Sequence, residues 1–362
     1  MAFFRYRNVR TMPKVELRRA QIHLTNRCNL NCKYCEVPRK FVHTKDLADD
    51  KWIEIVNDLC EMKAREITIS GGGEPTLRFD LLIDILKITR KNDIKTGVIT
   101  NGTLLRNDFA RKVVEVQPDE WRTSICAPEK NIDAFLRGED LSEISFNGIR
   151  YISEWKKKLN SELPKLEIWM VQTKYNIQSI EKMIQKASEI GANSISLRMV
   201  NPPNSWLYPS EEQRKTFVKN LDNYKKIAIE LGLELRIHFT LDDILPHNII
   251  ENIYEIEGSN NTKFSSKIKL ENRVKKDKIV CMFPFHELVI FADGRVSPCC
   301  NFIAHDETSK AVENITDKNL KKIWFGKKFE QFRKNMVENN PPARCRECTP
   351  DFQCVNREYK RS

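Results

Sequence analysis

The chain has 362 residues, of which 40% are hydrophobic and 31% are charged, a composition typical of a folded globular protein rather than a disordered one. It contains no apolar run near the ~18 residues of a membrane-spanning helix and no signal-peptide core at its start, so we expect a cytoplasmic protein of about two domains. The net charge is +11, but the basic residues are scattered among acids without interleaved aromatic residues, which disfavours a nucleic-acid partner.

Short β-branched or apolar segments alternate with longer segments of helical periodicity over the first two thirds of the chain. Residues 52–63, 79–91, 180–190 and 216–231 have the helical pattern. The predicted strands are residues 20–24, 66–70, 96–100, 121–125, 166–172, 194–200 and 234–239. About six such strand-helix units predict parallel strands joined by right-handed crossovers. Because a closed barrel needs eight units, we expect an α/β fold with a partial (β/α)6 barrel of TIM type and functional residues at the carboxyl ends of its strands.

The alternation stops after residue 240. Residues 288–291 and 295–297 predict a hairpin around Asp293-Gly294. A single helix with apolar residues 323, 324, 329 and 332 is expected before a cysteine-rich tail. We therefore expect a small α+β domain held together by metal. The predicted divisions are an extension at 1–17, a barrel at 18–245, a basic linker at 246–280 and the tail domain at 281–362.

Eleven cysteines are present, and nine of them fall in two groups. Disulfide frameworks belong mainly to short secreted chains, so metal ligation is the favoured interpretation. In the first group, Cys28, Cys32 and Cys35 follow the first predicted strand. Three thiolates suit a cluster iron, and the missing fourth ligand leaves a position open for chemistry. The alternative is a zinc site with a distant fourth ligand.

The second predicted strand ends in the sequence Ser-Gly-Gly-Gly-Glu-Pro at residues 70–75. Bare backbone at this point could approach a ligand, and the carboxylate of Glu74 could meet a cation. Gly-rich turns between a strand and a helix are common, so a simple tight turn is the alternative interpretation.

Together the CxxxCxxC and GGGEP motifs resemble the radical S-adenosylmethionine superfamily, over residues 20 to about 240. The resemblance implies that the three cysteines bind a [4Fe-4S] cluster whose open iron chelates S-adenosylmethionine. It also implies contacts from the chain to that cofactor. The candidate contact residues are Gly72, Gly73, Glu74, Asn101, Ser124 and Arg198. Arg198 could instead pair with a substrate carboxylate, and the residues at 101 and 124 could be ordinary turn and strand-end residues.

The second cysteine group could by ligand type bind either zinc or a cluster. Its members are Cys281, Cys299, Cys345, Cys348 and Cys354. With Gly294 five residues before Cys299, this group resembles a SPASM domain or its shortened form, Twitch, although the further CxxxC and final cysteine of a full SPASM domain are missing. The resemblance implies one auxiliary iron-sulfur cluster, with the first four as favoured ligands and Cys354 as competitor. We expect Cys60, Cys126 and Cys300 to be ordinary packed thiols.

The resemblance implies reductive cleavage of S-adenosylmethionine and hydrogen abstraction by the resulting 5′-deoxyadenosyl radical, with flavodoxin or ferredoxin as electron donor. We expect oxidation of a small molecule such as a sugar or aminocyclitol. Peptide or protein side-chain modification is the alternative, followed by nucleic-acid modification or a non-enzymatic metal-stabilised binding protein. The expected inward-facing residues are Trp169, Gln172, Arg198 and His238.

Overall fold

The computed structural model describes residues 14–35, 45–200, 206–238, 281–299, 312–316, 318–338, 340–343 and 345. Within these residues one sheet runs through the molecule in the order β10-β9-β8-β1-β2-β3-β4-β5-β6-β7. The strands are β1 Arg19–Ile22, β2 Glu66–Ile69, β3 Lys95–Thr100, β4 Glu120–Ser124, β5 Lys165–Gln172, β6 Ser194–Met199, β7 Glu234–Ile237, β8 Glu287–Ile290, β9 Arg295–Ser297 and β10 Glu313–Asn314. The strands β1 to β7 are parallel neighbours in chain order.

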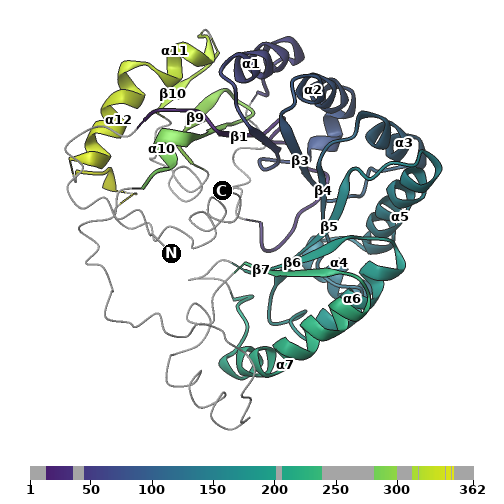
Figure 1. The fold of residues 1–362 in the computed structure, drawn as a ribbon. Coiled ribbons are helices and arrows are strands. Elements are labelled where there is room, and N and C mark those ends of the chain that lie inside the picture. Colours follow the sequence, from purple (N-terminus) through teal and green to yellow (C-terminus); the bar gives the residue numbers. More distant parts are fainter. Residues whose placement is uncertain are drawn as a thin grey trace.

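Helices cover the outer face of the curved sheet, as Figure 1 shows. They are α1 Asp49–Glu61, α2 Phe79–Lys91, α3 Asn107–Val116, α4 Lys130–Arg137, α5 Ser142–Lys158, α6 Ile180–Glu189 and α7 Glu211–Glu230, with a short 3-10 turn η2 at Pro75–Arg78. The tail adds α10 Phe283–His286, α11 Leu320–Trp324 and α12 Lys327–Val337. The partial barrel and all of its predicted strands are therefore confirmed, within one or two residues at most described ends.

Alternation along the strands determines which side chains face the helices and which face the barrel interior. In β5, Leu166, Ile168 and Met170 are buried in the main apolar core, whereas Glu167 lies on the opposite face and hydrogen-bonds to residues of β4 and β7. The core of the fold therefore lies between sheet and helices. The concave interior carries the polar side chains.

The tail does not form a separate sheet. Strand β8 pairs with β1 in parallel, with Arg19 opposite Glu287 and Ile22 opposite Ile290, and β9 returns antiparallel to β8. The hairpin around Asp293-Gly294 is thus confirmed, and it extends the barrel sheet at its β1 edge (Figure 1).

The single helix predicted in the tail is wrong, because two helices, α11 and α12, occupy that segment. The break comes at Phe325 and Gly326. A Cβ at Gly326 would lie 2.5 Å from the carbonyl oxygen of Lys322, so only glycine permits the chain to turn this closely.

Two buried side chains fasten the tail helices. Asp58 of α1 accepts hydrogen bonds from the Leu320 amide at 2.8 Å and from Asn319 at 2.7 Å, which caps the start of α11. Arg333 of α12 is 2% exposed and donates to the carbonyl oxygens of Pro284 at 2.7 Å and Trp324 at 2.8 Å. These bonds hold α11 against the barrel and α12 against the segment that begins at Cys281.

In the parts of the chain that the structure describes, no helix is both long and apolar enough to cross a membrane.

Candidate functional site

The first three cysteines lie on one loop, residues 23–35, which leaves the carboxyl end of β1 and is called the cysteine loop below. Cys28 and Cys35 are exposed and Cys32 is half-buried. Near its end the loop turns tightly, with the Cys35 amide 3.2 Å from the Cys32 carbonyl oxygen. The loop also reaches across the barrel mouth, because the Lys33 amide donates to the Leu136 carbonyl oxygen of α4 at 2.8 Å. The three thiols are thus presented at the carboxyl end of the barrel.

Asp46 fixes the first part of the cysteine loop. Its carboxylate accepts hydrogen bonds from the Thr25 hydroxyl at 2.5 Å and the Asn26 amide at 3.1 Å, and it lies 3.5 Å from Arg27. One carboxylate therefore holds three consecutive residues just before Cys28. Charge-assisted bonds of this kind are stronger than neutral ones.

The glycine turn, residues 70–74 at the end of β2, is pressed against that same segment. A Cβ on Gly73 would lie 1.7 Å from the Arg27 carbonyl oxygen, and one on Gly72 would lie 2.6 Å from the Thr25 carbonyl oxygen. Gly71 and Gly72 both have positive φ angles, 64° and 61°. No other residue type fits all of these positions without displacing the cysteine loop. The two predicted motifs therefore meet backbone to backbone.

Glu74 connects the ends of β2 and β3. Its carboxylate is buried and accepts hydrogen bonds from the Thr100 hydroxyl at 2.6 Å, the Asn101 amide at 2.7 Å, and both the amide and hydroxyl of Thr76. Burial still raises the pKa of this carboxyl above its usual range, against the hydrogen bonds that lower it. Glu74 therefore links the ends of β2 and β3 by hydrogen bonds and stabilises the carboxyl end of the barrel.

Asn101 connects this group of hydrogen bonds to the cysteine loop. Its side-chain amide donates to Asn29 at 2.9 Å, and Asn29 donates in turn to the Thr103 hydroxyl at 2.8 Å. The predicted residues Glu74 and Asn101 thus lie in one hydrogen-bonded chain that ends beside Cys28. Asn29 and Thr103 could not be predicted as part of the site, because their roles depend on contacts about 70 residues apart in the chain.

Behind the cysteine loop lies a fully buried ion pair that sequence reasoning missed. Arg137 and Asp133 are both 0% exposed, 3.3 Å apart at their charged atoms. Arg137 also donates to the Asn101 carbonyl oxygen at 2.8 Å, and the Asp133 carboxylate accepts from the Cys126 amide at 3.0 Å. The Tyr34 hydroxyl lies against the thiols of Cys126 and Cys32. Cys126 is therefore packed, as predicted, and it backs the cysteine loop.

The described thiols fit the expected cluster in their chemistry. Within the described residues, no three cysteine, histidine or acidic side chains are gathered closely enough to hold a single metal ion. The cysteine-loop thiols are nevertheless near enough to influence one another: burial raises the pKa of Cys32 to about 11, and the neighbouring Cys35 and Cys28 add to this. A thiol must lose its proton to bind iron, and the positive charge of the iron favours that deprotonation.

Ser124 and Arg198 lie farther into the interior, around Trp169. Ser124 is opposite Trp169 in the strand register, and the Arg198 guanidinium lies 4.0 Å from the Trp169 ring centre. His238 is 2.8 Å from Ser196 and faces the same interior. The expectation that Gln172 faces inward is wrong, because strand alternation places it with Met170 on the helix-covered face, where it is fully buried.

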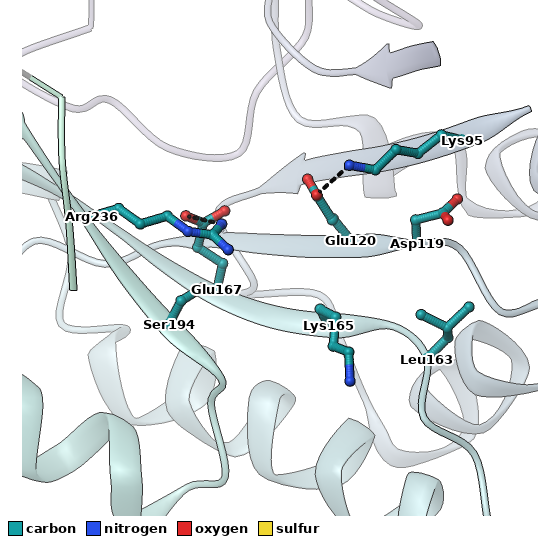
Figure 2. A pocket seen from close by; sticks show the side chains of 8 residues that line it. All are labelled: Lys95, Asp119, Glu120, Leu163, Lys165, Glu167, Ser194 and Arg236. Carbon is teal, nitrogen blue, oxygen red and sulfur yellow. Dashed lines mark hydrogen bonds and ion pairs between the residues drawn. The ribbon is translucent and has the colours of Figure 1, made fainter. Parts of the chain in front are cut away.

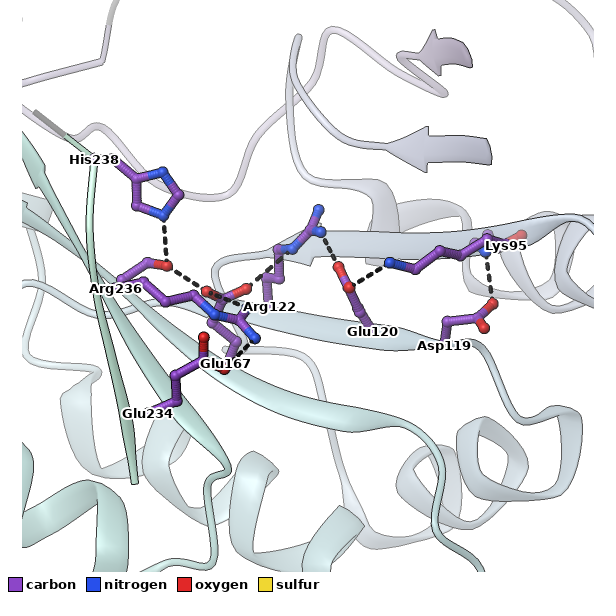
Figure 3. A network of polar contacts seen from close by, with 10 residues as sticks. Lys95, Asp119, Glu120, Arg122, Glu167, Glu234, Arg236 and His238 are labelled. Atoms are coloured by element: carbon purple, nitrogen blue, oxygen red, sulfur yellow. Dashed lines mark hydrogen bonds and ion pairs between the residues drawn. The ribbon is translucent and has the colours of Figure 1, made fainter. Parts of the chain in front are cut away.

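Below Trp169, toward the amino ends of the strands, the interior is filled by ion pairs (Figure 3). Glu167 is their centre: it accepts from Arg122 and from Arg236, each at 3.1 Å, and from the Ser196 hydroxyl. Burial opposes ionisation of Glu167, yet the Ser196 hydroxyl and the two guanidiniums together hold its pKa below the usual range. This carboxylate is therefore charged at neutral pH.

A cavity of about 270 Å³ opens at this amino end of the barrel (Figure 2). Its lining residues are Lys95, Asp119, Glu120, Leu163, Lys165, Glu167, Ser194 and Arg236. Most of its charges are already satisfied, for example Lys95 by Glu120 at 2.7 Å. The cavity lies at the opposite end from the cysteine loop, so it is not the cofactor site.

His23 is a further residue that the sequence did not single out. It is 6% exposed, and its ring lies beneath Gly71 and 4.9 Å from the Phe291 ring of the tail hairpin. Burial, with a smaller effect of Arg295, lowers the pKa of His23 to about 3. A neutral imidazole thus joins three parts of the site: β1, the glycine turn and the tail.

Three of the predicted auxiliary cysteines lie within the described residues. Cys281 precedes α10 and so lies before the start of β8, while Cys299 follows Ser297, the partner of Val289. Because β8 runs parallel to β1, both cysteines lie toward the amino end of the sheet. Cys345 is described at the end of the tail. Cys300, Cys348 and Cys354 lie outside the described residues, as does the predicted linker.

Two family profiles match the sequence. The profile of the radical SAM superfamily matches residues 22–187, and that of the SPASM iron-sulfur cluster-binding domain matches residues 281–349. A Pyrococcus furiosus protein named tungsten-containing aldehyde ferredoxin oxidoreductase cofactor-modifying protein is 21% identical, covering 92% of this chain and 87% of its own. PqqA peptide cyclase of Bradyrhizobium diazoefficiens is 23% identical, covering 62% of this chain and 57% of its own.

Solved structures share the fold. Streptococcus suis SuiB, bound to its precursor peptide SuiA, has a TM-score of 0.62 at 17% identity, covering 89% of this chain and 67% of the SuiB chain. The structure of anSMEcpe with bound AdoMet has a TM-score of 0.61 at 17% identity, covering 94% of this chain and 95% of its own.

Proposed function

This chain belongs to the radical S-adenosylmethionine superfamily and carries a SPASM iron-sulfur domain, and from this premise we propose that it abstracts a hydrogen atom from a peptide or protein side chain. Its cofactors are a [4Fe-4S] cluster, S-adenosylmethionine and iron-sulfur in the tail domain. The observation that carries the radical step of the proposal is the contact between the cysteine loop and the glycine turn, where a Cβ on Gly73 would meet the Arg27 carbonyl oxygen at 1.7 Å.

When bound, the cluster and S-adenosylmethionine supply an electron and a 5′-deoxyadenosyl radical. The chain itself orients and shields this chemistry. Cys28, Cys32 and Cys35 hold the cluster, while the bare backbone of Gly72 and Gly73 leaves room for the methionine end of the cofactor. Glu74 fixes that turn through its hydrogen bonds to the end of β3, and Asn101 fixes the cysteine loop. Ser124 and Arg198 supply polar contacts deeper in the interior.

Cys281, Cys299, Cys345 and Cys348 are proposed as ligands of one auxiliary cluster, with Cys354 as the competing ligand. The described members near the hairpin lie toward the amino end of the sheet, whereas the cysteine loop lies at its carboxyl end. A substrate in the interior would therefore have the radical source on one side and the auxiliary cluster on the other. If these cysteines hold a cluster there, it would supply an electron acceptor for a net oxidation of the substrate.

The peptide class is supported by the relatives: one is named a peptide cyclase, and SuiB was solved with a precursor peptide. Oxidation of a small molecule is the second candidate. It is supported by the Pyrococcus furiosus relative, which matches nearly the whole chain and whose name describes modification of a cofactor.

Anaerobic reconstitution and an assay for 5′-deoxyadenosine, with dithionite and S-adenosylmethionine, test the radical step. Absence of 5′-deoxyadenosine from protein with an intact first cluster would contradict it. For the substrate class, a deuterated cell lysate is separated into a peptide and protein fraction and a small-molecule fraction. Deuterium in 5′-deoxyadenosine from the first fraction supports the peptide proposal, and deuterium from only the second supports the small-molecule candidate.

A further inference from the structure

Three exposed aromatic side chains meet at the carboxyl end of the barrel, beside the cysteine loop. Phe135, Tyr175 and Trp206 are 38%, 39% and 55% exposed. The Phe135 ring centre lies 4.7 Å from that of Tyr175 and 6.1 Å from that of Trp206, and Tyr175 and Trp206 are 6.1 Å apart. These three rings, with Lys33 and Lys174, are called the aromatic patch below.

The two lysines lie over the rings. The Lys33 ammonium is 5.0 Å from the Phe135 ring centre, and the Lys174 ammonium is 5.2 Å from Tyr175 and 5.6 Å from Trp206. Both lysine side chains are exposed to solvent. The patch therefore combines apolar ring surface with two positive charges that remain available to an acidic partner.

The patch is attached to the cysteine loop by backbone. Lys33 stands between Cys32 and Tyr34, and its amide donates to the Leu136 carbonyl oxygen, next to Phe135, at 2.8 Å. On the Lys174 side, the Lys174 amide donates to Leu207, the neighbour of Trp206, at 2.8 Å. Three separate chain segments are thus fixed around one end of the loop.

The rings have no role in the apolar core of the fold. Exposed apolar clusters commonly mark binding sites, and aromatic residues dominate the energy of protein interfaces. The inner side of the cysteine loop contacts the glycine turn and Asn101. The aromatic patch lies next to the thiols on that loop, because Lys33 is the chain neighbour of Cys32 and its amide is bonded to the Leu136 carbonyl oxygen beside Phe135.

Resting on the proposed function, we propose that the aromatic patch docks an acidic electron-transfer protein of the flavodoxin or ferredoxin class, which reduces the first cluster. The step moves one electron from the reduced carrier to the cluster and leaves the carrier oxidised by one electron. Lys33 and Lys174 steer the acidic surface, and the rings supply the apolar contact. Charge complementarity across such a contact increases mainly the association rate and its dependence on salt.

The test uses the reconstituted full-length protein and the variants Trp206→Ala and Lys174→Glu. Phe325→Ala is the matched control, because Phe325 is also 55% exposed but lies in the tail between α11 and α12. Affinity for oxidised flavodoxin and for oxidised ferredoxin is measured by calorimetry at low and high salt. Formation of 5′-deoxyadenosine is measured in parallel with the reduced carrier and with dithionite.

The proposal predicts that each patch variant weakens carrier binding about tenfold or more, that only Lys174→Glu also reduces the salt dependence, and that the rate with dithionite stays at the wild-type value. The control variant should behave as wild type in every measurement. Unchanged carrier binding in both patch variants, or no binding of either carrier by wild type, would overturn it.

Two further outcomes would assign the patch to another occupant and overturn the proposal. An equal loss of rate with dithionite and with the carrier would point to substrate or cofactor binding. A wild-type dimer that Trp206→Ala converts to a monomer would point to a second copy of this chain. If wild type forms no 5′-deoxyadenosine with dithionite, the proposed function fails, while the binding measurements still decide the patch.

Discussion

The two ends of the barrel interior use polar residues in opposite ways. At the amino end, Glu167 is surrounded by Arg122, Arg236 and Ser196, and the charges are mutually satisfied. At the carboxyl end, glycines and thiols line the surface, and the buried acid Glu74 is occupied by hydrogen bonds inside the protein. The difference shows that the amino end contributes to stability, whereas the carboxyl end keeps backbone and sulfur available for a cofactor.

The largest expected effect comes from removing a ligand at the carboxyl end. Cys32→Ala should reduce 5′-deoxyadenosine formation to background, because three protein thiolates are needed to leave one iron open. Iron content should fall by about four atoms per chain, the size of one cubane cluster. Thermal unfolding of the apo form should stay close to wild type. Retention of full iron together with activity would contradict the assignment.

At the amino end the expected effect is on stability. Glu167→Gln removes the buried carboxylate that Arg122 and Arg236 share, while each guanidinium keeps a second carboxylate partner. It should lower the free energy of unfolding by about 1.5–3 kcal/mol, the range for hydrogen bonds to a charged group. Asp84→Asn, which breaks the exposed pair with Lys87, should cost less than about 1 kcal/mol. Urea denaturation measures both. An equal decrease in the free energy of unfolding in the two variants would show that the buried Glu167 network stabilises the fold no more than an exposed ion pair does.

The glycine turn permits a sharper comparison between steric contact and backbone strain. Gly72 and Gly232 have similar positive φ angles, 61° and 71°. A Cβ added to Gly72 would lie 2.6 Å from the Thr25 carbonyl oxygen, whereas a Cβ added to Gly232 would have no atom within 4 Å. Both Ala substitutions carry a strain of about 1–2 kcal/mol. Only Gly72→Ala should also weaken S-adenosylmethionine binding, measured by calorimetry on the reconstituted protein. Equal affinity in the two variants would show that the close approach does not matter.

The effect confined to a shift in conditions is the pH dependence of stability at His23. Its pKa is about 3 in the fold because of burial and Arg295, whereas an unfolded histidine titrates near ~6.5. The unfolded chain therefore binds more protons below that pH, so the contribution of His23 to stability is complete above pH ~6.5 and falls as pH drops toward 3.

His23→Gln should remove this dependence, which amounts to about 2 kcal/mol between pH 7.5 and 5. Denaturation at the two pH values, with wild type as reference, measures it. The same pH dependence in wild type and variant would show that another group is responsible.

Much of the site was predictable from sequence because its elements are local. The spacing of Cys28, Cys32 and Cys35, the glycines of the turn, and the period of each strand depend on neighbours within a few residues. These patterns indicated the barrel, the chemistry and the end of the strands at which it occurs. The prediction that Gln172 faces the interior was wrong, because strand alternation turns this side chain to the helix-covered face. The prediction of one tail helix was wrong, because the close approach of the chain at Gly326 separates two helices.

The sequence by itself determined the cofactor chemistry of this protein, since ligand type and spacing are properties of a short segment. Only the tertiary structure decided that the tail hairpin joins β1 in parallel, and hence that the auxiliary cysteines Cys281 and Cys299 lie toward the opposite end of the sheet from the cysteine loop. It also decided that Arg137 lies behind that loop, and that three distant aromatic residues meet beside it. These features depend on which segments the folded sheet brings together, and residue spacing along the chain carries no record of that.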